Sequence, residues 1–112
     1  MRTAKQKLAK IADGLWKEKC LEKWGDICII CGLPANTFHH FILKSRNGLM
    51  VYDIENGVPV CQKHHSILHG ITRNPNDVYE LVRIIREKRG KKWANYIDKK
   101  AKIHKGGFKT IK

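Results

Sequence analysis

The segment 37–69 reads TFHHFILKSRNGLMVYDIENGVPVCQKHHSILH, and five of the six histidines of the chain lie within it. Two are adjacent near its start, and the other three are gathered in its last six residues. A C-x-x-C pair, Cys28 and Cys31, lies just upstream, and Cys61 lies inside the segment. Imidazole and thiolate are the side chains that bind transition metals best. This concentration of both indicates that the segment folds around metal ions.

Four of these side chains form two short turns with matching spacing, here called knuckles. Cys28 and Cys31 make the first, and Cys61 and His64 repeat the x-x interval with histidine in the last place. Together they form a Cys3His set suited to tetrahedral zinc. Unrelated buried thiols and a surface histidine are the alternative, but that does not account for two equal spacings. We therefore predict a structural zinc site, with residues 39–56 inserted between its halves.

A second metal site can be formed by histidines that are not ligands of the predicted zinc site. His39 and His40 are adjacent in a β-like run, 37–44, where successive side chains point to opposite faces. We expect one of them to hold a metal ion and the other to handle a proton. His65 and His69 lie four residues apart on a predicted helix, hence on one face. The histidine before His65 is about a quarter-turn away and can face the zinc instead.

This pattern resembles the HNH endonuclease family, whose fold is called ββα-metal. The resemblance covers residues 28–69 and includes the two knuckles, the paired histidines and the interval from Asn56 to His65. The further histidine, His69, is similar to the colicin-type DNases, in which both helix histidines and the first of the paired histidines hold the metal. Residues 12–16 also resemble phage NinG-type recombination nucleases.

The chain departs from the pattern of that family at three places. His64 replaces the second-knuckle cysteine of most zinc-bearing members, and His39 stands where many members have aspartate. The segment 43–46 lacks the proline that often follows the paired histidines. The resemblance implies a metal-dependent DNA endonuclease with one divalent cation, whose products carry a 5′-phosphate and a 3′-hydroxyl.

Each of the remaining functional candidates has an expected role. His40 is the general base that takes a proton from the attacking water, its ring oriented by a backbone carbonyl of the following loop. Asn56 pins that loop through backbone hydrogen bonds, with an ordinary turn asparagine as the alternative. His39 and His65, with His69, hold the catalytic cation. Because these ligands are all imidazoles, Ni²⁺, Co²⁺, Zn²⁺ or Mn²⁺ should bind at least as readily as Mg²⁺.

The charge of the chain points to a polyanionic partner. The formal net charge is +13 and the isoelectric point about 9.9, which favours DNA over an anionic membrane surface. Lys44 and Arg46 are candidates for gripping phosphates beside the scissile bond, with solvated loop charges as the alternative. The tail 105–112 is a further phosphate-binding candidate or a solubilising end. No separate base-reading helix is evident, so we expect largely sequence-independent or structure-selective DNA binding by a monomer or weak dimer.

The length of 112 residues predicts one α+β domain whose small core is stabilised by the structural metal. The expected parts are an N-terminal helix 1–25, a zinc-stabilised ββα-metal core 26–70, C-terminal helices 71–104 and a basic tail 105–112. No apolar run reaches a membrane-spanning length, and no signal-type segment follows the start. We therefore expect a cytoplasmic protein of a prokaryote or a phage-infected cell.

The N-terminal helix carries apolar residues at three- and four-residue steps, among them Leu8, Ile11 and Leu15. This stripe is expected to lie over the zinc module. Trp16 and Trp24 continue it and are interpreted as core side chains rather than base-stacking ones. The remaining cysteine, at position 20, is interpreted as a packing residue.

Two other functions remain open from the sequence. A zinc-stabilised nucleic-acid-binding module without catalysis accounts for the charge and the knuckles. It does not account for His39, His40, Asn56, His65 and His69 at the spacing of the family. A three-histidine metalloenzyme acting on a small molecule fits the ligands but not the net charge of +13.

Overall fold

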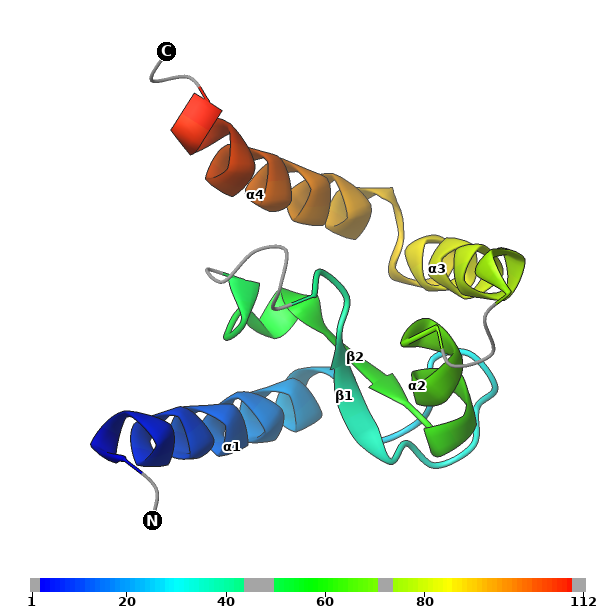
Figure 1. The fold of residues 1–112 in the computed structure, drawn as a ribbon. Helices are drawn as coiled ribbons and strands as arrows, with labels where there is room; N and C mark the ends of the chain where they lie inside the picture. Colours follow the sequence, from blue (N-terminus) through cyan, green and yellow to red (C-terminus); the bar gives the residue numbers. More distant parts are fainter. Residues whose placement is uncertain (1–2, 44–49, 71–73, 110–112) are drawn as a thin grey trace.

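The computed structural model describes residues 3–43, 50–70 and 74–109, with side chains placed through residue 101. Within these ranges the chain forms four α-helices, a 3₁₀ turn and one two-stranded antiparallel sheet (Figure 1), so the predicted α+β class is confirmed. Lys44 and Arg46, the two predicted phosphate-binding residues, lie outside the described ranges.

The elements follow one another in the order α1 (Ala4–Trp24), β1 (Thr37–His40), η2 (Ile54–Asn56), β2 (Gly57–Val60), α2 (Gln62–Leu68), α3 (Pro75–Arg89) and α4 (Lys91–Lys109). α1 begins at a capping box, in which Thr3 and Gln6 exchange side-chain-to-backbone hydrogen bonds. It ends at Gly25, whose φ of 79° suits glycine. β1 is shorter than the predicted run 37–44, and α4 continues into the tail, through Lys109.

The sheet is the centre of the molecule (Figure 1). β1 and β2 pair in antiparallel register with His39 opposite Val58 and Phe38 opposite Pro59. In a two-stranded sheet both strands are edges, so Pro59 is tolerated although it lacks an N–H. Its carbonyl accepts a hydrogen bond from the Ile29 amide at 2.9 Å, which attaches the first knuckle to the outer edge of β2.

The core lies between the sheet and the helices α2, α3 and α4. Val58 and Val60 of β2 are fully buried, as are Ile85 of α3 and Ile97 of α4. Burial of such aliphatic side chains contributes about 1.5–3 kcal/mol each. The C-terminal helices therefore belong to the same core as the knuckles rather than to a separate unit.

All three tryptophans of the chain hold the turn before β2. The indole N–H groups of Trp16, Trp24 and Trp93 donate to the successive carbonyls of residues 53–55, at 2.8, 3.0 and 2.8 Å. Two of these indoles come from α1 and one from α4. The Asp53 and Ile54 carbonyls also accept backbone N–H groups within the turn, so the indoles occupy their second lone pairs. The flanking helices therefore fix η2 through hydrogen bonds as well as packing.

α1 packs differently from the sequence-based expectation. Trp16 and Cys20 are buried against η2 and β2, which confirms both as packing residues. Burial also raises the pKa of the Cys20 thiol to about 12. Leu8, Ile11 and Leu15 are 67%, 60% and 55% exposed, so the prediction that this part of the stripe covers the zinc module is wrong. The N-terminal end of the helix projects past the sheet, away from the other helices and strands that the structure describes (Figure 1).

The close packing of α1 on β2 can be tested at Gly57. A β-carbon at this position would overlap Cys20 Sγ and lie 3.1 Å from the Trp16 ring. Gly57→Ala should therefore lower the free energy of unfolding by about 1–3 kcal/mol, as overpacking does. The measurement is denaturant-induced unfolding.

Gly14→Ala is the matched control, since an added β-carbon there meets nothing within 4 Å. In the middle of α1 it should raise stability by up to about 1 kcal/mol. Adding Cys20→Ala to Gly57→Ala should recover part of the loss because it makes room. If both glycine substitutions change stability alike, the described packing of α1 is incorrect.

Candidate metal centres and active site

The two knuckles meet in space and bring four ligands together. Atoms of Cys28, Cys31, Cys61 and His64 that could bind a metal all lie within 4.8 Å of one another. The closest pair, Cys61 Sγ and His64 Nδ1, is 3.2 Å apart, and Cys28 Sγ lies 3.7 Å from the same nitrogen. The cluster is close enough to hold a metal ion, as predicted, and three sulfurs with one imidazole are a donor set typical of structural zinc.

The first knuckle favours the thiolate form of Cys28. Its turn is closed by a hydrogen bond from the Gly32 amide to the Cys28 carbonyl at 2.9 Å, with Gly32 at a φ of 78°. Burial opposes ionisation of the Cys28 thiol, but backbone hydrogen bonds, chiefly at Cys31 and Cys61, outweigh it and lower the pKa. The pKa of His64 is also lowered, by burial and by the charge of Lys63. Both effects favour the deprotonated forms that bind metal.

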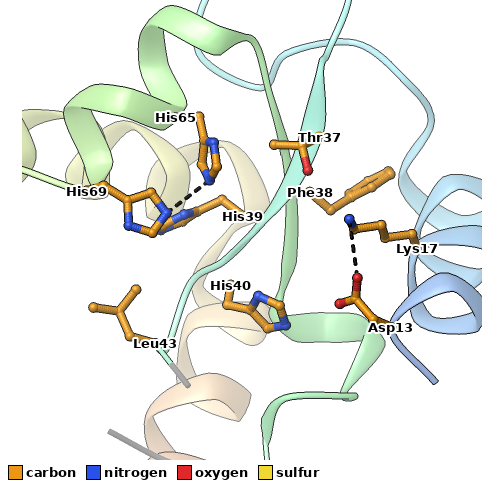
Figure 2. A pocket seen from close by; sticks show the side chains of 9 residues that line it. All are labelled: Asp13, Lys17, Thr37, Phe38, His39, His40, Leu43, His65 and His69. Carbon is orange, nitrogen blue, oxygen red and sulfur yellow. Dashed lines mark hydrogen bonds and ion pairs between the residues drawn. The ribbon is translucent and has the colours of Figure 1, made fainter. Parts of the chain in front are cut away.

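Three other histidines form a second cluster (Figure 2). His39 comes from β1, and His65 and His69 come from one face of α2 and its C-terminal cap. Their nitrogen ligand atoms lie within 4.8 Å of one another. The Nε2 atoms of His65 and His69 are 3.0 Å apart, and the His39 ring centroid is 5.5 and 5.1 Å from theirs. A single cation could contact all three rings.

The surroundings of His39 and His65 favour the neutral form of both rings. His39 is 4% exposed, and burial, followed by the charges of the neighbouring histidines, lowers its pKa to about 3. The pKa of His65 is lowered by burial, by His69 and by Lys17. Among the described residues, Nδ1 of His39 is buried and has no hydrogen-bond partner. A buried nitrogen without a hydrogen bond costs free energy, and a transition-metal cation requires a neutral imidazole as its ligand. The residues therefore fit such an ion.

His40 faces the opposite side of β1, as alternation along a strand requires. Its ring stacks on Trp16 of α1, with centroids 4.1 Å apart and planes 8° from parallel. Its Nε2 lies 2.9 Å from the Val51 carbonyl oxygen. Because a carbonyl can only accept, Nε2 carries the proton and Nδ1 of the neutral ring carries the lone pair. The paired histidines therefore lie in different surroundings, His39 within the histidine cluster and His40 against Trp16 and the Val51 carbonyl.

Asn56 bonds both ends of the connection that carries the Val51 carbonyl. It is fully buried, its Oδ1 accepts from the Ile42 amide at 2.7 Å, and its Nδ2 donates to the carbonyls of Ile42 and Met50 at 3.0 and 3.1 Å. The Asn56 carbonyl also accepts from the Phe41 amide at 2.9 Å. These bonds fix the residue next to Val51 and so position the partner of His40.

The two faces of β1 open into one cleft of about 490 Å³. His39, His40 and the two α2 histidines line it, and Asp13 and Lys17 of α1 complete its opposite wall (Figure 2). The sequence analysis missed these two residues. Their i, i+4 spacing is common on solvated helices and gives no signal that one turn of α1 reaches the site.

Comparison with known proteins adds no assignment. No family model, no curated protein sequence and no solved structure matches this chain. Among the described residues, the helices are all too short or too polar to cross a membrane. The function of the chain is therefore inferred from the geometry of the two clusters and from the spacing of their residues.

The first cluster makes a testable prediction about metal content. Cys28→Ser or Cys61→Ser should abolish stoichiometric zinc binding and much of the folding stability, because structural zinc contributes ~10 kcal/mol or more to the folding of small zinc-finger peptides. Metal analysis and thermal unfolding measure the two effects. Cys20→Ser is the control, since it alters a buried thiol outside the cluster and should keep the zinc. A chelated, zinc-free protein that unfolds like the parent would refute the assignment.

The second cluster predicts that one substitution can keep or raise the stability of the protein while it removes cation binding. His39→Leu replaces a buried imidazole by an apolar side chain of similar size, so the protein should be as stable as the parent or more stable. It should also lose binding of Ni²⁺ or Co²⁺ at this cluster, measured by calorimetry on zinc-loaded protein.

The parent and His39→Leu should also differ in how the free energy of unfolding depends on pH. Between the ordinary histidine pKa of 6.5 and about 3, the unfolded parent binds a proton at His39 that the folded parent excludes. The parent therefore loses stability as the pH falls through this window, and His39→Leu lacks that contribution. Identical pH dependence of unfolding in both proteins would contradict the described burial of His39.

Proposed function

We propose that this protein is a metal-dependent endonuclease of the HNH type, which hydrolyses phosphodiester bonds of DNA. One observation carries the proposal. Adjacent residues of β1 present two imidazoles to the same cleft, His39 within a three-histidine cluster and His40 fixed separately by a carbonyl and an aromatic ring. A ligand set beside an independently oriented base is the arrangement that metal-assisted hydrolysis needs.

The order of the elements around the cleft supports the same proposal. An antiparallel strand pair followed directly by a helix, β1, β2 and α2, has the order of a ββα-metal core. The Cys3His cluster closes the other face of α2, where a structural Zn²⁺ would sit.

The cation cluster would hold a divalent metal through His39, His65 and His69. When bound, such an ion stabilises negative charge on the phosphate and on the leaving 3′ oxygen. The protein contributes neutral ligands at fixed positions. His65 and His69 are one turn apart on α2, and His39 is held in the sheet opposite Val58. Three imidazoles form a softer set than carboxylates, which favours Ni²⁺, Co²⁺, Zn²⁺ or Mn²⁺.

His40 is the proposed general base. With Nε2 donating to the Val51 carbonyl, Nδ1 receives the proton of the attacking water. The imidazolium that forms still donates to the same carbonyl, so the hydrogen bond is retained through the step. Stacking on the Trp16 ring keeps the imidazole plane fixed. It also places the positively charged imidazolium against the face of an aromatic ring. Asn56 acts indirectly, since it positions the segment to which Val51 belongs.

The substrate class follows from charge. A net charge of +13 on 112 residues would attract a polyanion and would repel a small cationic substrate. Among the described residues, the cleft is lined by four imidazole rings and one lysine, together with Asp13 and apolar side chains, and the lysine can contact a phosphate. A nucleic-acid-binding module without catalysis has the same charge, and the experiment below separates the two.

His40→Ala decides between them. It removes the proposed base and leaves both metal clusters intact, so turnover in a plasmid-cleavage assay should fall by roughly 100- to 10,000-fold. DNA affinity and zinc content should remain those of the parent. His65→Ala should also lose activity, but excess metal should restore part of it because the defect is in cation binding.

His104→Ala is the control, since it removes the one histidine outside the segment 37–69. It should cleave like the parent. If the parent binds DNA but no divalent metal supports cleavage, the binding-module interpretation replaces the nuclease. If His40→Ala cleaves at the parental rate, His40 is not the base.

A further inference from the structure

The N-terminal helix contributes a charged pair to the cleft that the proposed mechanism does not use. Asp13 and Lys17 lie on the wall opposite the histidines, and their side chains are 3.3 Å apart (Figure 2). Lys17 keeps 48% of its side chain exposed although it lines the cleft.

We propose that Lys17 binds a backbone phosphate of the nucleic-acid strand next to the one at the cation cluster. The inference rests on the proposed function for the identity of the ligand, a nucleic acid, but not on catalysis. A strand carries a negative charge at every nucleotide, so the strand that places one phosphate at the histidines carries further phosphates along the cleft. Lys17 is the ammonium group that lines this cleft among the described residues.

Asp13 sets how that ammonium group is presented. In the protein without nucleic acid, the carboxylate pairs with Lys17 one helical turn away and holds it over the cleft. Such an exposed pair is weak, so a phosphate can take the place of the carboxylate at little cost. The carboxylate itself repels a nearby phosphate. The geometry therefore assigns opposite effects on nucleic-acid binding to Lys17, which favours it, and to Asp13, which opposes it.

The fixed position of this turn explains why Lys17 can act as a binding residue. Trp16 precedes it in sequence, is 3% exposed, and is anchored by its stack on His40 and its hydrogen bond to the Asp53 carbonyl. α1 therefore has no freedom to rotate Lys17 away from the cleft without breaking contacts of the proposed base. Its place on the wall of the cleft distinguishes Lys17 from the other described lysines of α1.

The test is equilibrium binding of a short fluorescein-labelled DNA duplex to zinc-loaded protein without a divalent cation at the second cluster, over a series of salt concentrations. Lys17→Ala should weaken binding about eightfold at 0.1 M salt and reduce the slope of log affinity against log salt by about 0.9, the contribution of one phosphate contact. Lys17→Arg should retain the parental slope. Asp13→Asn should tighten binding.

Lys19→Ala is the matched control. It removes the same charge from the same helix, but Lys19 pairs with Glu22 and does not line the cleft. If Lys17→Ala and Lys19→Ala change affinity and slope equally, the Lys17 site is refuted. A parent that binds duplex but cleaves none leaves the Lys17 result valid and overturns the nuclease instead. A parent that binds no DNA overturns both.

Discussion

The hydrogen bonding of residues 53–56 is the constraint on which the site depends. Three successive carbonyls accept indole N–H groups from α1 and α4, and the buried side chain of Asn56 then bonds backbone on both sides of the connection from β1. Arg89 adds a hydrogen bond to the Gly57 carbonyl at 2.9 Å. Burial lowers the pKa of this guanidinium to about 10, and its Cζ atom lies 3.4 Å from the centroid of the Trp24 ring. A four-residue turn thereby joins the flanking helices to the strand that carries the histidines.

The helix α2 connects the two clusters. His64 points to the three cysteines, and His65, the next residue, points to His39. The same seven-residue helix is therefore anchored on one face by the knuckles and offers ligands on the other. Helices this short are unstable alone. The proposed catalytic cluster consequently depends on the metal-binding cluster for its geometry, although no residue belongs to both.

Local spacing was sufficient to predict a large part of this arrangement. Knuckle spacing predicted the Cys3His cluster, strand alternation separated His39 from His40, and the i, i+4 rule paired His65 with His69. The stack of His40 on Trp16 and the presence of Lys17 in the cleft could not be predicted in this way. Both depend on how α1 docks against a turn that is 30 or more residues away, and an amphipathic pattern does not specify which part of a helix is covered.

Because α2 presents ligands to two clusters from two of its faces, its length is more restricted than its composition. Inserting one residue between His64 and His65 would turn every later side chain by about 100° and shift it by about 1.5 Å. Both following histidines would then leave His39, while the four knuckle ligands stayed in place. The exposed positions of α2, such as Gln62 and Lys63, can be substituted without moving the ligands. An insertion at this point would preserve the four knuckle ligands and remove the second site in a single step.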